Sequence, residues 1–456
     1  MIGITHWQHT PYTLCTDPTI KRELFITQIL PQADGFTVNY RDTDTRVHTL
    51  CYRKRGSEEW LESKSFTVTG LDKDTDYEVA VKRGSGEMTA PRLAHTFEPI
   101  GTIVNYLHPE DPAYISSGRF LCSPGLCLLP SGKLLASMDV FDHGAAQNLT
   151  LIFESIDNGN NWQYLTELRP CFWGKLFVHR GRLYMLGMSC EYGDMLIGVS
   201  DDEGRTWTPP VRLFSGANAR EIGWHKAPMP IVEHEGILYT AIDYGAWKHG
   251  GHANCIASCA ADADLLNPAN WHMTDPLPYD SKWNGVPKGE VQGLLEGNAV
   301  AAPDGSILNI LRIQQFKADP AWGTAIALKL TDRDQSLSFD HAINFPLGTS
   351  SKFVILKMKN TYVAIGNEPH MPEAPAARNL LSVAISDDLV QWQIVERVVD
   401  GRAYDRTKVA FQYPDMVLSG DDLVILSRTS WGGASSFHDS NMITCHRINN
   451  FAKYLK

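Results

Sequence analysis

The feature that most constrains this chain is a short motif that occurs twice with the same internal spacing. The stretches 155–162 and 200–207 carry Ser, Asp, Gly and Trp at matching offsets, and a shorter third copy lies at 386–392. In such a motif the carboxylate accepts hydrogen bonds from turn N–H groups, glycine supplies a positive φ, and tryptophan packs the turn onto the next strand. The motif predicts a hairpin turn, and its recurrence predicts a fold made of repeated strand units.

A longer pattern recurs from residue 123 onward and contains these turns. Each unit has an apolar strand, a tight polar or glycine turn, a second apolar strand, a variable loop and a third strand. The first hairpins turn at Ser131-Gly132, Arg180-Gly181, Glu235-Gly236, Asp304-Gly305, Lys359-Asn360 and Gly420-Asp421. The third strands are expected at 151–154, 196–199, 255–258, 325–328, 381–384 and 442–445. Three or four strands in each unit of about 45 to 70 residues are typical of a propeller blade, which predicts an all-β, six-bladed β-propeller.

The first 98 residues do not follow this repeat. Their run 66–81 resembles the late strands of fibronectin type III domains, in which a Leu and a Tyr bracket the loop between two strands. We therefore expect a small fibronectin type III-like β-sandwich at 1–98, which either binds a glycan or partner or is a structural appendage. Residues 99–119 are expected to be a linker or a closing strand, with part of a seventh blade as the alternative, and the propeller is expected at 120–456.

Composition excludes several functions. The formal net charge of −11 argues against a nucleic-acid partner and against an anionic membrane surface. The sequence contains no run of about 18 apolar residues, which would predict membrane insertion, and no signal peptide is visible. We therefore expect a soluble protein that is cytoplasmic or exported with its signal removed. The nine cysteines form no C-x-x-C pair, which predicts reduced thiols. His249 and His252 are too few to predict a metal site, and no cofactor is implied. Oligomeric state is not encoded in these patterns.

Polar residues are expected to converge at one end of the propeller axis. The inner strand of every blade begins at this end, and the loop after the second strand opens there too. At the strand starts these residues are Lys175, His225, Lys226, Glu296, Asn298, Lys352, Gln412 and Tyr413. On the loops they are Asp139, Asp142, His143, Glu191, Tyr244, His249, His252, Arg312, Asn367, Arg378, Arg428, His438 and Asp439. Because buried charges are costly unless they are paired or used, this ring predicts a functional site.

The chain resembles the sialidase superfamily, whose propellers carry the turn motif as the Asp-box. Glu296 opens an inner strand and Arg312 ends the hairpin that follows, as a Glu and an Arg do in that family. Arg378 precedes the third strand of the next blade, and Tyr413 opens the last blade like the family's nucleophile. The resemblance implies that Tyr413 attacks the anomeric carbon while Glu296 takes its proton. It also implies that Arg312 and Arg378 bind a sugar carboxylate.

The chain departs from this family in its first blade. Sialidases have Arg-Ile-Pro there, whereas this chain has Cys122-Ser123-Pro124, so the first arginine of their triad is absent. Losing a charge-assisted bond of about 1.5 to 3 kcal/mol argues against sialic acid as the natural ligand. The general acid is expected at Asp142 or Asp139. Further substrate-binding residues are expected at Arg428, Lys226, Tyr244, Asn298, Gln412 and His438.

Histidines supply a rival chemistry. His225 opens the third blade, and His438 lies on the last loop. In a polysaccharide lyase, His225 or Tyr244 would take the proton next to a uronate carboxylate, and Arg312 or Arg428 would stabilise the resulting charge. The predicted function is therefore an exo-glycosidase that removes an acidic terminal sugar from a glycan, with Tyr413, Glu296, Asp142 and His225 as the candidate catalytic residues. A lyase acting on uronate-containing glycans is the alternative, and a non-catalytic glycan-binding propeller is the third possibility.

Overall fold

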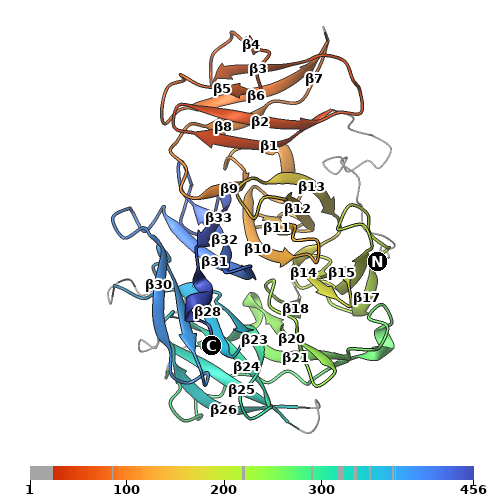
Figure 1. Cartoon of the computed structure of the whole chain (residues 1–456), viewed down its shortest axis with the longest axis vertical. Helices are drawn as coiled ribbons and strands as arrows, with labels where there is room; N and C mark the ends of the chain where they lie inside the picture. The colour runs from red at the N-terminus through yellow and green to blue at the C-terminus, as the bar shows by residue number, and fades with distance from the viewer. Residues whose placement is uncertain are drawn as a thin grey trace.

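The protein consists almost entirely of β-strands (Figure 1). The computed structural model describes residues 24–84, 86–217, 221–288, 291–315, 323–331, 336–348, 351–371, 374 and 376–456. The helices in these ranges are short 3-10 turns: η1 (Pro112–Tyr114), η2 (Trp247–His249), η3 (Pro268–Asn270) and η4 (Phe451–Tyr454). None of these described turns has the length or apolar character to cross a bilayer. The all-β class expected from the sequence is confirmed.

Two small sheets come first in the chain and face each other across an apolar core. The first contains β1 (Phe25–Gln32), β2 (Gly35–Arg41) and β5 (Thr67–Val68). The second contains β3 (His48–Lys54), β4 (Leu61–Ser63), β6 (Asp76–Arg83), β7 (Glu87–Met88) and β8 (Arg92–His95). Phe36, Leu50 and Val79 are completely buried between them. The assignment of this part to the fibronectin type III type stays a prediction.

The larger part of the chain forms antiparallel sets of strands around a common centre (Figure 1). The first set is β10 (Phe120–Leu128), β11 (Leu134–Phe141), β12 (Leu149–Ser155) and β13 (Gln163–Leu168). The second set is β14 (Phe172–His179), β15 (Arg182–Met188), β16 (Met195–Ser200) and β17 (Val211–Phe214). The third set is β18 (Gly223–His225), β19 (Val232–His234), β20 (Ile237–Ala246), β21 (Gly251–Ala260) and β22 (Trp271–Met273), and the fourth is β23 (Val291–Ala301), β24 (Ile307–Gln315), β25 (Thr324–Thr331) and β26 (Ser336–Asn344). A parallel pair between β21 and β23, at His252 and Gly293, joins these two sets into one sheet. The fifth set is β27 (Val354–Met358), β28 (Thr361–Asn367), β29 (Leu380–Ser386) and β30 (Gln393–Asp400). The sixth set is β31 (Ala410–Ser419), β32 (Asp422–Ser430) and β33 (Met442–Ile448), together with β9 (Thr102–Tyr106). Every third strand expected from the sequence lies in β12, β16, β21, β25, β29 or β33.

Each set packs on the next through a buried apolar cluster. These clusters include Leu135 with Leu183, Tyr184 with Leu238, Ile256 with Leu294, Ile310 with Ile355, Ile365 with Ile425, and Ile443 with Leu121. The last of them joins the final set to the first, so the packing closes on itself. Such radial packing of four-stranded sheets is the architecture of a propeller, and it leaves only short strand edges exposed.

The final sheet is completed by a strand from the beginning of the chain. β9 pairs antiparallel with β33, and the register joins Tyr106 to Met442 and Thr102 to Cys445. Residues 99–119 thus hold the strand that closes the last sheet. The first and last parts of the propeller are fastened by backbone hydrogen bonds as well as by apolar packing.

The N-terminal sheets rest on this closure. β1 contacts both β9 and β13, and Figure 1 shows the two small sheets stacked on that side of the larger body. The amide of Gln28 donates to the Val104 carbonyl at 2.6 Å. The Arg41 guanidinium donates to the Tyr164 carbonyl at 2.9 Å and lies over the ring of the same tyrosine. The two N-terminal sheets therefore cover β13 and β9, which are the outer strands of the first and last strand sets.

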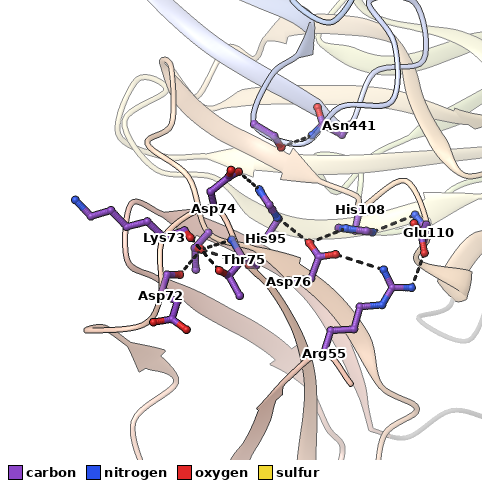
Figure 2. Close-up of polar contacts among 12 residues, drawn as sticks. Arg55, Asp72, Lys73, Asp74, Thr75, Asp76, His95, His108, Glu110 and Asn441 are labelled. Carbon is purple, nitrogen blue, oxygen red and sulfur yellow. Dashed lines mark hydrogen bonds and ion pairs between the residues drawn. The ribbon is translucent and has the colours of Figure 1, made fainter. Parts of the chain in front are cut away.

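A charged network reinforces the same junction (Figure 2). Asp76 on β6 interacts with His95 Nδ1 at 2.7 Å, with Arg55 Nη1 at 3.3 Å and with Nε2 of His108, which follows β9, at 3.3 Å. Arg55 also pairs with Glu110 beyond β9. Burial would raise the pKa of Asp76, but the two histidines lower it on balance. The network ties the second small sheet to the segment that leads into the propeller.

The repeated turns have the geometry that the motif predicts. Asp157 accepts hydrogen bonds from the Asn161 N–H and the Ser155 hydroxyl, both at 2.8 Å, and Trp162 Nε1 donates to the Gly159 carbonyl at 3.2 Å. The second motif repeats these bonds. In the shorter third copy Leu389 stands in the place of glycine and has φ of 66°. Its carbonyl accepts the hydrogen bond from Nε1 of Trp392. The pattern of bonds is thus kept even where the glycine is lost.

Candidate active site

The first strands of four sets share a local irregularity. Each contains a β-bulge, and a bulged residue has a left-handed backbone: Ser123, Trp173, Glu296 and Tyr413, with φ between 51° and 53°. Positive φ is uncommon for residues other than glycine and is retained where the surroundings enforce it. Bulges turn a side chain away from the direction that a regular strand would give it. The same device is therefore repeated on four inner strands.

All four bulged side chains line one cavity of about 730 Å³. The further lining residues are Cys122, Phe141, His143, Gly144, Ala145, Gln147, Phe172, Glu191, Tyr192, His225, Ala246, Trp247, Lys248, Arg428 and His438. The lining mixes aromatic rings with ionisable groups, as is usual for sites that bind small polar ligands. The residues expected from the sequence that line this cavity are Tyr413, Glu296, His225, His143, Glu191, Arg428 and His438.

Arg312 connects the two residues expected to carry the chemistry. Its Nε donates to Glu296 Oε2 at 2.6 Å, and its Nη2 donates to the Tyr413 hydroxyl at 3.4 Å. Glu296 and Arg312 are both buried. Burial would raise the pKa of Glu296, but the charge and hydrogen bond of Arg312 outweigh it and lower the pKa. A direct bond between Tyr413 and Glu296 was expected, whereas in the described residues Arg312 bonds to both.

Two further arginines lie against the same tyrosine. The guanidinium carbon atoms of Arg378 and Arg428 are 5.6 Å and 5.3 Å from the centre of the Tyr413 ring. Gln412 accepts a hydrogen bond from Arg378 Nη1 at 2.6 Å and so holds this side chain in place. Burial, together with the charges of Arg312 and Arg428, lowers the pKa of Arg378 to about 10. Three guanidinium groups therefore gather around one phenol.

His225 is held by a buried carboxylate. Its Nδ1 lies 2.8 Å from Asp243 Oδ2, and the side chains of both residues are almost completely buried. Asp243 also accepts hydrogen bonds from the Glu296 N–H, at 3.1 Å to each oxygen, and from the Asn254 amide at 2.5 Å. Burial raises the pKa of Asp243, although the His225 hydrogen bond acts in the opposite direction. The sequence predicted a role for His225 but gave no signal for Asp243 as its partner.

The remaining predicted residues are placed around the cavity rather than in its lining. Asn298 is completely buried and bonds to the backbone of Ile310, Phe353 and Ile355, which is a structural arrangement. Tyr244 packs its ring on Trp224 at 4.8 Å.

Three ionisable residues lie behind or beside the lining. Lys226 is buried behind Trp173, and its ammonium donates to the Trp173 carbonyl at 3.4 Å. Asp142 faces Arg119 at 3.5 Å, next to the lining residue His143. Asp139 is buried, which raises its pKa to about 7 despite hydrogen bonds from Thr150 and the Trp173 N–H.

The structure adds aromatic residues that the sequence analysis missed. Trp173, Tyr192 and Trp247 line the cavity beside His225. The signal for Trp173 was available, because Ser123, Trp173, Glu296 and Tyr413 are each followed by Pro or Gly within an apolar first strand. Tyr192 and Trp247 lie on loops, where no periodicity marks them.

Neither a metal site nor a disulfide is found in the part of the chain that the structure describes. No cluster of three His, Cys, Asp or Glu side chains there has a geometry that could hold a metal ion. His249 is exposed in η2, whereas His252 is buried and stacks on Tyr192. The described cysteines are free thiols, and Cys15 lies outside the described residues.

Known structures share this fold. No protein-family model and no curated protein matches the sequence. The Hadza microbial sialidase Hz136 is similar over 93% of this chain and 92% of its own, with a TM-score of 0.51 and 13% identity. The GH93 α-L-arabinofuranosidase of Fusarium graminearum, solved with arabinobiose, is similar over 76% of this chain and 97% of its own, with a TM-score of 0.51 and 14% identity. A protein of unknown function from Dyadobacter fermentans gives a TM-score of 0.50 at 11% identity, over 76% of this chain and 97% of its own.

These likenesses concern the fold. The expected similarity to sialidase propellers is confirmed at that level, and the arabinofuranosidase shows that the same fold occurs in a second kind of glycosidase. Identities of 11% to 14% do not carry site residues from one protein to another. Function must therefore be argued from the side chains of this cavity.

Proposed function

We propose that this protein is a glycoside hydrolase that removes an acidic terminal sugar from a glycan. Tyr413 is the nucleophile, Glu296 accepts its proton, and Arg312, Arg378 and Arg428 bind the sugar carboxylate. The observation that carries the proposal is the gathering of these three guanidinium groups around the Tyr413 ring and hydroxyl. Guanidinium groups suit a carboxylate because their planar donors bind it bidentately.

The same arrangement supports the chemistry. A neutral phenol is a weak nucleophile near pH 7 and needs a base and a stabilising charge. Arg312 provides a hydrogen bond to the phenol oxygen at 3.4 Å and connects it to the Glu296 carboxylate at 2.6 Å. The lowered pKa of Glu296 keeps this carboxylate ionised in the resting site. Arg428 also gives the site a third arginine, although Cys122 stands where sialidases have the first arginine of their triad. The Arg428 guanidinium lies over the ring of Phe141, which lines the cavity together with Cys122.

The test is hydrolysis by the full chain of a panel of glycans that end in uronic or other acidic sugars. Release of the terminal sugar is expected from at least one of them. Tyr413→Phe should reduce turnover by several orders of magnitude with little effect on folding, because it removes one oxygen and keeps the ring packed. Tyr404→Phe, at an exposed tyrosine, is the matched control. Near-normal turnover by Tyr413→Phe would contradict the proposed nucleophile.

A uronate lyase is the second candidate, because His225, whose Nδ1 is bonded to Asp243, lines the same cavity and could remove a proton next to a carboxylate. The two reactions differ in their products. A lyase creates a C=C bond conjugated to the carboxylate, which absorbs ultraviolet light, whereas a hydrolase does not. A rise in ultraviolet absorbance with the same glycan panel would favour the lyase, and binding without turnover would favour a glycan-binding propeller.

We also propose that the six strand sets are six blades and that 1–98, of which residues 1–23 and 85 lie outside the described residues, is a fibronectin type III-like domain. Six apolar interfaces that join the sets in a closed ring support the first proposal. Two facing sheets at β1–β8 support the second. With this division, 120–456 holds the catalytic cavity and β9 closes the ring.

A further inference from the structure

The cavity holds a second polar group that the proposed hydrolysis has not yet used. His225, at the end of β18, lines the cavity together with Tyr413 and Glu296. Its Nδ1 is occupied by Asp243 at 2.8 Å, so Nε2 is the ring nitrogen left to act on a ligand. Within the described residues, Nε2 has no hydrogen-bond partner. A glycosidase needs a proton donor at the leaving-group oxygen in addition to its nucleophile.

We propose that His225, positioned by Asp243, is the general acid and base at the glycosidic oxygen of this enzyme. This inference rests on the proposed glycosidase function and extends it, because it names the residue that handles the leaving group. Tyr413 and Glu296 then serve the anomeric carbon, and His225 serves the oxygen that departs. Asp243 does not touch the substrate and is a positioning residue.

The surroundings of His225 fix its ring in one orientation. The Trp173 ring contacts it edge-on with centroids 4.3 Å apart, and the His252 ring lies 4.7 Å away. Asp243, which is itself buried, bonds to Nδ1. A histidine whose one nitrogen is bonded to a carboxylate keeps a defined tautomer and presents the other nitrogen. The ring is therefore arranged to donate or accept a proton at Nε2 only.

The two halves of the site share one carboxylate. The backbone N–H of Glu296 donates a hydrogen bond to the Asp243 carboxylate, with the nitrogen 3.1 Å from each oxygen. The same carboxylate is bonded to Nδ1 of His225. Glu296 is the bulged residue of β23 and has φ of 53°. Asp243 thus stabilises the bulge that aims Glu296 and the imidazole that we assign to the leaving group. This link explains why a buried acidic residue stands between two strand sets at this point.

The proton balance of the reaction is complete with these residues. In the first step Tyr413 Oη bonds to the anomeric carbon, Glu296 takes the phenol proton, the glycosidic C–O bond breaks, and the imidazolium Nε2 gives its proton to the departing oxygen. In the second step neutral His225 takes a proton from water, whose oxygen bonds to the same carbon. The bond to Tyr413 breaks, and Glu296 returns the proton to the phenolate. No other reactant is needed.

Asp139, one of the acids expected from the sequence, is buried outside the cavity lining, and its two oxygens already accept hydrogen bonds from Thr150 and the Trp173 N–H. Two further carboxylates are the alternatives for this role. Asp142 faces Arg119 at 3.5 Å, and it is His143 that lines the cavity next to it. Glu191 lines the cavity and accepts a hydrogen bond from the Gln147 amide at 2.8 Å. Neither is connected to Glu296, whereas His225 is connected to it through Asp243. The geometry therefore favours His225.

The experiment compares leaving groups. Two glycosides of the acidic sugar that the wild-type chain releases best are used, one with 4-nitrophenol and one with a simple alcohol as the leaving group. His225→Gln should lower kcat/KM about 10²- to 10⁴-fold for the alkyl glycoside. It should change the 4-nitrophenyl glycoside far less, because that leaving group departs without a proton. His341→Gln, at a surface His–Asp pair with a spacing of 2.6 Å, is the matched control and should change neither.

Two further readouts separate catalysis from structure. With His225→Ala, added azide should restore turnover of the 4-nitrophenyl glycoside and give a glycosyl azide, because azide needs no general base. Asp243→Asn should lower kcat/KM for the alkyl glycoside and hardly change it for the 4-nitrophenyl glycoside, since the imidazole is then no longer held for proton transfer at Nε2. Should Asp243→Asn fail to fold, the leaving-group comparison and the azide product decide the question alone.

The outcomes are distinguishable. If the wild-type chain cleaves no glycoside of any acidic sugar, the proposed function itself fails and this inference fails with it. If the wild type cleaves both glycosides but His225→Gln slows them equally and azide has no effect, only this inference is overturned. If Glu191→Gln or Asp142→Asn shows the leaving-group dependence instead, that carboxylate is the acid and His225 is structural.

Discussion

At the scale of single residues, Arg312 has the most consequences for the site. Its guanidinium is buried and bonds to both Glu296 and Tyr413, so its position sets the separation of the base and the nucleophile. A buried ion pair contributes little net stability, but removing one partner leaves a buried charge that costs about 3 to 5 kcal/mol. Arg312 is therefore unsuitable for testing substrate binding by substitution, because loss of the fold and loss of the carboxylate contact would be mixed.

Arg378 offers a cleaner test of the acidic-sugar proposal. Arg378→Ala should lower kcat/KM for an acidic glycoside about 10- to 100-fold, since one charge-assisted contact contributes about 1.5 to 3 kcal/mol. Turnover of the methyl ester of the same substrate should hardly change, because the ester carries no charge. The measurement is the ratio of the two rates in both variants. Equal losses for acid and ester would contradict a role in carboxylate binding, and Arg402→Ala, at an exposed arginine paired with Asp400, is the control.

Lys226 gives a prediction for the pH dependence of stability. Burial and the charges of Lys175 and Lys352 lower its pKa from 10.5 to about 7. At this lysine the unfolded chain therefore binds more protons than the folded protein between these values, so the contribution of Lys226 to stability rises with pH across this window. Below pH 7 the folded protein carries the full cost of the buried charge. Lys226→Met, which removes that cost, should stabilise the protein more at pH 6 than at pH 9.

Urea unfolding at the two pH values measures this difference. Lys64→Met, at an exposed lysine, should give the same change in unfolding free energy at both. If the stability change of Lys226→Met were independent of pH, the ammonium would not titrate in this window, and the account of its environment would be wrong.

At the scale of structural elements, the bulges in the inner strands explain which features could be predicted from the sequence and which could not. The hairpin turns and third strands were predictable, because polar or glycine turns between apolar runs mark them directly. Tyr413 and Glu296 were predicted from their places at the starts of inner strands. Trp173 was missed, because a regular strand would alternate its side chains and a bulge breaks that alternation. The partner of His225, Asp243, depends on the register of β18 with β20, which no local pattern specifies.

Gly297, which follows the bulged Glu296, is predicted to be required for this geometry. A Cβ at this position would lie 2.1 Å from Oδ1 of Asn309, a completely buried side chain that bonds to Asn254. Gly297→Ala should cost about 1 to 3 kcal/mol by overpacking and should also reduce activity, because the bulge must shift. Denaturant unfolding and turnover measure the two effects.

Gly86→Ala is the control for this change. No atom lies within 4 Å of a Cβ at that position, so stability and turnover should both stay close to those of the wild type. If Gly297→Ala had full stability and activity, the bulge would tolerate a side chain and the tight packing described for it would be refuted.

At the scale of the whole molecule, the N-terminal sheets and the propeller share their apolar cores. Phe25 of β1 belongs to the cluster that joins the first and last strand sets, and Tyr106 of β9 and Met442 of β33 belong to the core of the N-terminal sheets. Units that share buried side chains lose stability together. Although the sequence marks two units, since the first 98 residues lack the repeat of the rest, it contains no signal for this shared packing, because the contacts join residues far apart in the chain.

We therefore expect calorimetry to show one unfolding transition for the full chain. Phe25→Ala, which opens a cavity where the units meet, should lower the temperature of that single transition, at a cost of about 3 to 5 kcal/mol. Leu61→Ala, on the exposed strand β4, should have little effect. Two separate transitions, or a shift in only one part of the trace, would show that the units unfold independently.

The pairing of β9 with β33 has a consequence for protein synthesis. β9 leaves the ribosome long before Met442–Ile448, and at about 5 to 20 residues per second the interval between them lasts roughly 20 to 70 s. During that time the edge of β9 that will pair with β33 has no partner, and unpaired strand edges invite association with other chains. The N-terminal sheets are translated before any blade, and β1 contacts β9 directly. They can therefore shield this strand on the nascent chain until its final partner is made.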